Sequence, residues 1–282
     1  MNNEMLSQVE VLAASIAAQE KKVHLKFVKL MVLAVLAGMF IALGAAGSSV
    51  AMHAIPNVGV SRTVGACIFP VGLMLIVFLG GELFTGDCLL ILGLYERKCK
   101  LLAVIRVLVL VWIGNLLGAV LIAALVYFSG QFGYSADLLG AFTIKVAYGK
   151  ATMNFGFALS SGILCNIFVC GAVLMATAAK SAAGKVWSIF FPIFAFVVSG
   201  FEHCVANMYY IPAGLMALNN DAYKAKAMEV YGYTNEQLSS LNVKSFFVNS
   251  SIPVTIGNII GGMLFVGTLL YIVHHKKESK QA

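Results

Sequence analysis

Long apolar stretches, almost free of charge, dominate the chain. A helix that crosses a membrane needs about 20 such residues in a row. Six stretches are long enough: 27–52, 63–81, 102–129, 152–179, 186–217 and 249–273. The pattern therefore predicts an all-α membrane protein with six transmembrane helices.

Polar residues interrupt the second and the fifth stretch. The second runs "VGACIFPVGLMLIVFLGG", meets "ELFTGD" at 82–87, and resumes as "CLLILGLY". The fifth runs to Gly200, meets Glu202 and His203, and resumes as "CVANMYYIPAGLMAL". Irregular backbone at membrane depth is tolerated only where it is buried in protein or lines a cavity. Both helices are therefore expected to be broken inside the membrane.

Short motifs recur in the two halves of the chain. "IGNLLG" at 113–118 returns as "IGNIIG" at 256–261, and an "FP" pair precedes each break. Three spans in each half place the halves, about 27–129 and 152–273, in opposite orientations. Such inverted repeats are typical of transport proteins, whose site lies where the broken helices meet. The alternative is that glycine-rich helices share packing motifs by chance.

The ends of the chain are more polar than its middle. In the segment 1–26, Leu6, Val9, Leu12 and Ile16 recur at helical spacing, which predicts an amphipathic helix on the membrane surface. Residues 27–273 form the channel domain, and 274–282 form a basic tail.

Positive charges are unevenly divided between the two sides of the membrane. One side of the predicted spans carries twelve Lys and Arg residues, the other six, and Arg106 lies inside a span. Cytoplasmic loops carry the excess of such residues, so both termini are expected in the cytoplasm. The net charge of +7 is then a feature of topology and no sign of nucleic-acid binding.

Composition supports the membrane assignment and gives no sign of a cofactor. The chain of 282 residues is 60% hydrophobic and 11% charged, whereas a soluble domain carries about 25% charged residues. The six cysteines form no CxxC pair and lie mostly in apolar runs, as small packing residues do. No metal or other cofactor is expected.

His203 is the single histidine in a mid-span position. An ionisable side chain in the membrane is costly, which favours a functional role over a purely structural one. Glu202, beside it, is expected to orient the backbone or the imidazole, and Asn207 follows four residues after His203. Together with Thr85, these three residues are expected to line the pore and relay the proton. Whether Glu202 faces His203 is left open by the sequence, and so is the resting charge of the ring.

The first break offers a hydroxyl and a flexible backbone. Thr85 lies among Gly80, Gly81 and Gly86, and amides freed at a helix break can bind an anion, although a plain loop is the alternative. Asn115 and Asn258 lie inside apolar helices, where either can be a pore group or an interhelical bond.

Large apolar side chains and one lysine surround the two breaks. Five side chains are candidates for hydrophobic constrictions, although packing is the ordinary role of such residues: Phe69, Leu73, Leu83, Phe84 and Phe196. Lys150, just before the fourth span, either snorkels to the interface or concentrates anions at a pore mouth.

Four stretches in order resemble signature sequences of the formate/nitrite transporter family. They are "LGGELFTG" (79–86), "GILCNIFVCGAV" (162–173), "GFEHCVANMYYIP" (200–212) and "IPVTIGNIIGG" (252–262). The resemblance covers about residues 26–273. It implies an aquaporin-like protomer of six helices in a homopentamer, each protomer with its own pore. The Asn-Pro-Ala boxes of true aquaporins are absent, which disfavours conduction of water or glycerol.

The resemblance also implies roles for particular residues. His203 matches the central histidine and Thr85 the threonine of the loop. Lys150 and Asn258 match the outer vestibule pair. The constriction positions match Phe69, Leu73, Leu83, Phe84 and Phe196.

The function expected is passage of small monovalent weak-acid anions across a prokaryotic cytoplasmic membrane. Formate is favoured as the commonest family substrate, with nitrite or hydrosulfide as the alternative. Lys150 draws the anion in, and His203 supplies a proton or a positive field. A membrane haem enzyme usually needs two axial ligands, which one mid-membrane histidine does not supply, so no enzyme is expected. Channel and proton-coupled symporter remain equally compatible with the sequence.

Overall fold

The computed structural model describes residues 5–275, and within this range all the regular elements are helices, with one isolated bridge between Met5 and Ala179. The basic tail predicted at 274–282 lies outside the described residues from 276 onward. Six segments are long and apolar enough to cross a membrane. They comprise α2 (Phe27–Met52), α3 (Val58–Ile68) with α4 (Val71–Leu79), α7 (Leu101–Phe128), α9 (Phe155–Ala178), α10 (Ala182–Ser199), and the run α14 (Val243–Ser245), η2 (Phe246–Ser251), α15 (Ile252–Ile259), η3 (Ile260–Thr268) and α16 (Leu269–His274).

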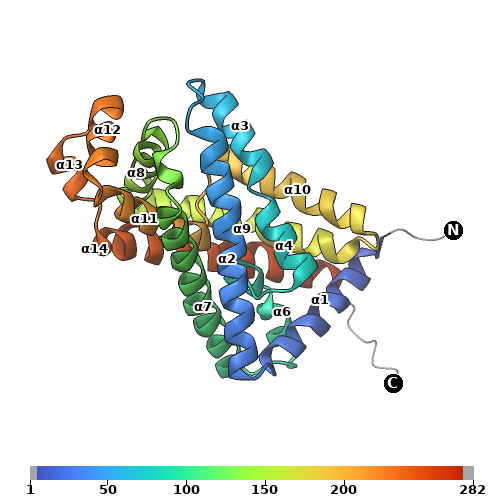
Figure 1. Ribbon diagram of the computed structural model, residues 1–282. Coiled ribbons are helices and arrows are strands. Elements are labelled where there is room, and N and C mark those ends of the chain that lie inside the picture. The colour runs from blue at the N-terminus through green and yellow to red at the C-terminus, as the bar shows by residue number, and fades with distance from the viewer. Residues whose placement is uncertain (1–4, 276–282) are drawn as a thin grey trace, which may run out of the picture.

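The remaining elements are shorter and lie at the ends or beside the breaks (Figure 1). They are α1 (Gln8–Val23), α5 (Phe84–Asp87), α6 (Leu90–Tyr95), η1 (Gln131–Gly133), α8 (Leu138–Ala151), α11 (Cys204–Leu218), α12 (Asp221–Tyr231) and α13 (Asn235–Ser239). The prediction of six spans is confirmed. The second span begins at Val58, five residues before the expected start, because Asn57 Oδ1 accepts a hydrogen bond from the amide of Val60 and caps the helix.

Both predicted breaks are present, and each begins at a glycine. The helix α4 ends at Leu79, and Gly80 follows with φ of 93°. The helix α10 ends at Ser199, and Gly200 follows with φ of 74°. Positive φ is accessible to glycine at little steric cost, so these two residues end their helices inside the membrane. The chain resumes as α5 and α6 after the first break and as α11 after the second.

Close helix pairs surround the breaks. The helix α2 packs along α7, and α15 packs along α9. A Cβ atom added at Gly118 would lie 2.0 Å from the carbonyl oxygen of Val35, and one at Gly261 would lie 2.3 Å from that of Ile163. Each IGNxxG motif therefore uses its second glycine to let two backbones meet.

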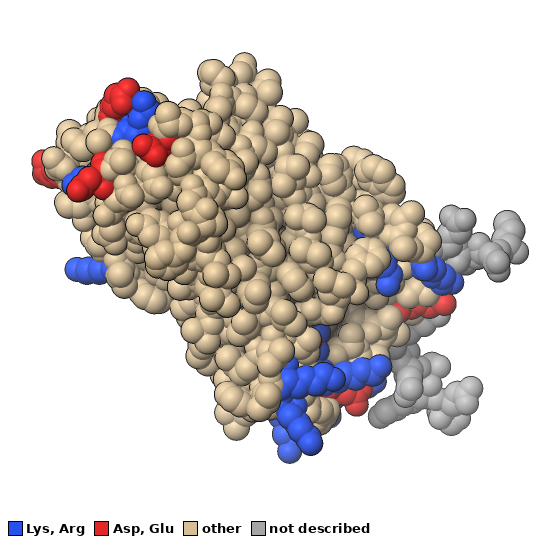
Figure 2. All heavy atoms as spheres, in the orientation of Figure 1, with Lys and Arg blue, Asp and Glu red and all other residues tan. Residues whose placement is uncertain are grey.

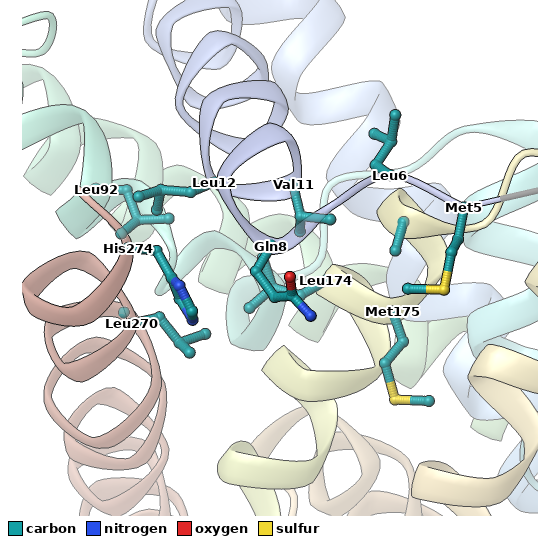
Figure 3. A pocket seen from close by; sticks show the side chains of 12 residues that line it. Met5, Leu6, Gln8, Val11, Leu12, Leu92, Leu174, Met175, Leu270 and His274 are labelled. Carbon is teal, nitrogen blue, oxygen red and sulfur yellow. The ribbon is translucent and has the colours of Figure 1, made fainter. Parts of the chain in front are cut away.

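The N-terminal segment forms the helix α1. Ser7 and Glu10 make a reciprocal capping box at its start, and Leu12, Ile16 and Val23 are buried. Val9 is 39% exposed, so the buried stripe begins one turn later than the spacing suggested. A pocket of about 190 Å³ lies beside its first turns, where Leu12 and Leu92 face His274 (Figure 3). Gln8 and His274 supply its polar side chains, and the other residues around it are apolar.

The charged side chains gather at two ends of the molecule. On the face in Figure 2 a wide uncharged belt separates a cluster near α12 and α13 from one near α1. Exposed apolar residues such as Leu102, Phe128 and Phe157 lie on the spanning helices. A surface of this kind suits a lipid environment, in which apolar side chains face outward.

Candidate functional site

The two broken helices meet at a hydrogen bond between Thr85 and His203. The distance between Thr85 Oγ1 and His203 Nε2 is 2.9 Å, and both residues are buried. The break after Gly80 brings Thr85 here from the first half of the chain, and the break after Gly200 brings His203 from the second. Residues that are 118 positions apart in sequence thus form one polar contact inside the membrane domain.

The second ring nitrogen of His203 is held by the backbone. His203 is the N-cap of α11, and its Nδ1 accepts a hydrogen bond of 3.1 Å from the amide of Ala206. Because an amide can only donate, Nδ1 carries no proton in this arrangement. The ring is then neutral, with its proton on Nε2, and Nε2 donates to the hydroxyl of Thr85.

Aromatic rings cover His203 on one side. The rings of Phe69 and Phe196 meet edge to face with centroids 5.7 Å apart, and Phe196 stacks over the imidazole at 6.0 Å. Both phenylalanines are 3% exposed. Both rings and His203 itself border one cavity, which is called the outer cavity below.

Leu73, Leu83 and Phe84 are also buried, at 3%, 4% and 3% exposure. Leu83 and Phe84 directly precede Thr85, and Leu73 comes from α4. In contrast to Phe69 and Phe196, these three residues do not border the outer cavity. Phe84 also borders an apolar groove between α7 and α15.

The outer cavity has a volume of about 360 Å³, and His203 is one of the residues that border it. Lys150 and Glu202 both border it, and Lys150 Nζ lies 2.8 Å from Glu202 Oε1. Lys150 Nζ also lies 5.3 Å above the ring of Tyr210. The structure thus places Lys150 in the vestibule, paired with a carboxylate.

Glu202 turns away from His203. Its Oε2 accepts a hydrogen bond of 2.7 Å from Asn207 Nδ2, which lies 2.9 Å from Ser250 Oγ. Asn207 is fully buried and does not border the cavity. The amide of Asn207 therefore holds the Glu202 carboxylate in place.

Asn115 and Asn258 brace the two breaks in the same way. Asn115 donates to the carbonyl groups of Ala34 and Glu82 and accepts from the amide of Phe84, at 2.7, 2.9 and 2.9 Å. Asn258 donates to the carbonyl groups of Gly162 and Glu202 and accepts from the amide of Cys204, at 2.8, 3.1 and 2.9 Å. Backbone groups that the breaks release from helices are satisfied in this way.

The position of Asn258 follows from these bonds. Asn258 is fully buried beside the second break and does not border the outer cavity. Of the two roles left open for the asparagines, the interhelical bond is the one that the geometry fits. The same three bonds at each break are the relation expected of an inverted repeat.

The sequence analysis missed a charged cluster beside the first break. Lys22 of α1 lies 2.6 Å from Glu82 Oε2 and 2.5 Å from Asp87 Oδ1, and the Asp87 side chain is fully buried. Burial lowers the pKa of Lys22, but the carboxylates of Asp87 and Glu82 raise it by more, so the lysine stays charged. Glu82 occupies the place in the first break that Glu202 occupies in the second. This correspondence is the signal that could have revealed the cluster. Because Glu202 pairs with a lysine, Glu82 is expected to have a lysine partner as well.

The cysteines hold no bridge. All six are free, and all but Cys67 are buried. No group of three or more His, Cys, Asp or Glu residues in the described range is arranged to hold a metal ion.

Comparisons with known proteins agree with this architecture. The family model described as "Formate/nitrite transporter" matches residues 9–272. A protein of Methanothermobacter thermautotrophicus named "Probable formate transporter" is 35% identical, over 98% of this chain and 100% of its own. The formate channel FocA of Haemophilus influenzae is 35% identical, over 74% of this chain and 73% of its own.

A solved structure described as a pentameric formate channel with formate bound has the same fold. It superposes with a TM-score of 0.77 at 32% identity, over 89% of this chain and 98% of that one. The range matched by the family model, residues 9–272, contains both breaks and both bracing asparagines. The chain belongs to the formate/nitrite transporter family.

Proposed function

We propose that the chain forms a homopentamer in the prokaryotic cytoplasmic membrane, with both termini inside, and passes formate through a pore in each protomer at His203 and Thr85. The observation that carries the proposal is the 2.9 Å contact between these side chains, at the point where two broken helices meet behind buried aromatic rings. The pentamer rests on the similarity to a channel of that assembly.

The apolar walls explain why the cargo is a weak acid. An ion that leaves water for an apolar passage loses solvation worth many kcal/mol unless its charge is removed or matched. Desolvation also raises the pKa of a carboxylic acid, so formate takes up a proton from water as it leaves the outer cavity. The neutral acid then passes Phe69 and Phe196.

His203 and Thr85 give the acid polar partners midway. A charge on the ring needs a proton on Nδ1, which breaks the bond from the Ala206 amide. It also places a cation at the N-terminus of α11, where the helix dipole disfavours it. His203 therefore stays neutral, and Nε2–H and the Thr85 hydroxyl bind the acid while its own proton crosses with it. One proton per anion makes transport electroneutral.

Uptake into proteoliposomes tests the substrate. Formate, nitrite and hydrosulfide are offered side by side between about pH 5 and 8, a range that spans the reference pKa of imidazole. Formate flux should be the fastest and should rise as the pH falls, because each anion crosses with a proton. In a planar bilayer the flux should carry no current. Formate uptake no faster than in protein-free liposomes would refute the proposal, and a formate current would refute its electroneutral form.

Substitutions at His203 separate hydrogen bonding from proton donation. His203→Phe removes the polar partner and should lower formate flux by about 10- to 100-fold, the equivalent of a lost hydrogen bond of about 1.5–3 kcal/mol. His203→Asn retains a donor and should keep a larger share of the flux with the pH profile unchanged in direction. Thr85→Val should lower flux, with Thr85→Ser as its matched control. Equal loss in the Phe and Asn variants would show that His203 supplies the proton itself.

A further inference from the structure

The outer cavity continues outward into a second one, and two cations stand between them. A cavity of about 480 Å³ lies beside the vestibule of about 360 Å³. The shared wall consists of Met52, Arg62, Phe142, Lys145 and Val146. An anion that enters through the second cavity passes Arg62 and Lys145 before it reaches Lys150 in the outer cavity.

Arg62 lies against the second break. A Cβ atom added at Gly200 would come within 3.1 Å of Arg62 Nη1, so the bare glycine lets the guanidinium rest on the backbone three residues before His203. Within residues 5–275, Arg62 forms no salt bridge and no side-chain hydrogen bond is recorded from its guanidinium. Its five N–H donors are free to bind an anion.

Lys145 belongs to α8, the helix that also carries Lys150. Its Nζ lies 4.6 Å from the ring centroid of Tyr231, which supports the ammonium group without neutralising it. Lys145 forms no salt bridge with any described residue. Both rim cations are exposed to solvent.

The vestibule therefore has a surplus of positive charge. Its border includes Arg62, Lys145 and Lys150, and Glu202 is the one acid among the described residues there. Glu202 is paired with Lys150, which leaves two positive charges unmatched. Entry of a single monovalent anion matches only one of them.

We propose that this rim, defined by Arg62 and Lys145, is a binding site for small dicarboxylates of the malonate and succinate class, which block the pore from outside. The proposal rests on the proposed function, since the block is a block of formate passage. One carboxylate lies on the planar fork of Arg62 with Lys145 beside it, as guanidinium groups bind carboxylates. The other carboxylate lies deeper in the vestibule towards Lys150. A volume of about 360 Å³ is within the range of small-molecule sites.

A dicarboxylate remains at the rim because its double charge prevents it from passing Phe69 and Phe196. The solvation that an ion loses grows with the square of its charge, so a dianion faces about four times the penalty of formate at Phe69 and Phe196. It needs two protons to become neutral, and formate needs one. A bound dianion thus fills the entrance without crossing.

Inhibition of formate uptake tests the site. Malonate is added outside proteoliposomes at constant ionic strength, and inhibition is expressed relative to the uninhibited flux of each variant. Malonate should compete with formate, and propionate, a monoanion of similar size, should inhibit less. Arg62→Gln and Lys145→Gln should each raise the half-inhibitory malonate concentration by about fivefold, the equivalent of about 1 kcal/mol for an exposed ionic contact. Lys244→Gln is the matched control, because Lys244 is exposed and borders neither cavity.

A second measurement does not depend on transport. Malonate should raise the melting temperature of the detergent-solubilised wild type more than propionate does, because a ligand that binds the folded state stabilises it. Both rim variants should show a smaller shift at the same malonate concentration, and the Lys244 variant should show the full shift. Formate flux that malonate leaves unchanged, or an equal shift in all variants, overturns the dicarboxylate site alone. Absence of formate flux with an intact malonate shift overturns the proposed function and supports the site.

Discussion

The two breaks in the membrane domain share a scaffold and differ in chemistry. Each begins at a glycine with positive φ, is braced by an asparagine from an IGNxxG helix, and carries a glutamate that contacts a lysine. The next positions diverge. The first break continues into Leu83, Phe84 and Thr85, and the second into His203 and Cys204.

The residues that the breaks share stabilise the backbone, and the residues that differ supply the groups proposed to contact the transported acid. The shared residues satisfy amides and carbonyls that a broken helix leaves without partners, which any break inside a membrane requires. The divergent residues supply the hydroxyl and the imidazole that meet at 2.9 Å. Substitutions in the shared set should therefore act mainly on stability.

The largest effect is expected from the bracing asparagines. Asn115→Ala and Asn258→Ala each strand two buried backbone groups of a break, at about 1–3 kcal/mol for each group. The third bonded carbonyl, of Ala34 or Gly162, lies inside a helix and keeps its helical partner. A loss of about 2–6 kcal/mol is expected at either site, measured as a lowered thermal midpoint in detergent. Asn235→Ala is the control, because Asn235 is exposed and has no recorded side-chain bond, and it should shift stability by less than about 0.5 kcal/mol. A lowered thermal midpoint in one asparagine variant but not in the other would show that the two asparagines are not equivalent.

The lysine partners should come next, with an asymmetry. Removing one partner of a buried ion pair costs about 3–5 kcal/mol, because the other charge is left uncompensated. Lys22→Met strands both Glu82 and Asp87, whereas Lys150→Met strands Glu202 alone. The Lys22 variant should therefore lose more stability, and the loss should shrink as the pH falls, since protonation removes the stranded charges.

A double variant sharpens this second comparison. Adding Glu202→Gln to Lys150→Met should restore most of the lost thermal midpoint, because no bare carboxylate remains. Lys226→Met is the control, as Lys226 pairs with the exposed Glu229 and should change little. Equal losses at Lys22 and Lys150 would mean that Asp87 is neutral in the native protein.

The sequence predicts most of the scaffold because the membrane imposes it. Length and apolar content give the six spans, and the polar runs at 82–87 and 202–203 give both breaks. The capping of the second span by Asn57 was missed, since caps lie in polar loops that hydropathy does not resolve.

Side-chain pairing was harder to predict than position. The sequence analysis singles out His203, Thr85 and Lys150, but not the groups that they contact. Glu202 lies in the break between α10 and α11, where no helical period sets the direction of its side chain. The sequence therefore leaves open whether Glu202 meets His203 or Lys150. Lys22 was counted for topology alone, because nothing in α1 shows that the helix folds back against the first break.

The smallest effect is expected at the glycines, and it differs between the breaks. Gly200 has φ of 74° and ψ of 28°, the left-handed helical region, where alanine costs about 1–2 kcal/mol. Gly80 has φ of 93° and ψ of 140°, a region nearly confined to glycine, where strain of about 1–3 kcal/mol is expected. Steric contacts do not reverse this order of strain. A Cβ atom at Gly80 would lie 3.9 Å from its nearest atom, and one at Gly200 would displace only the flexible end of the Arg62 side chain. Gly80→Ala should therefore lower the thermal midpoint more than Gly200→Ala does, with Gly149→Ala as a control of ordinary φ in open space. The reverse order would show that contact with Arg62, and not backbone conformation, decides the need for glycine at the second break.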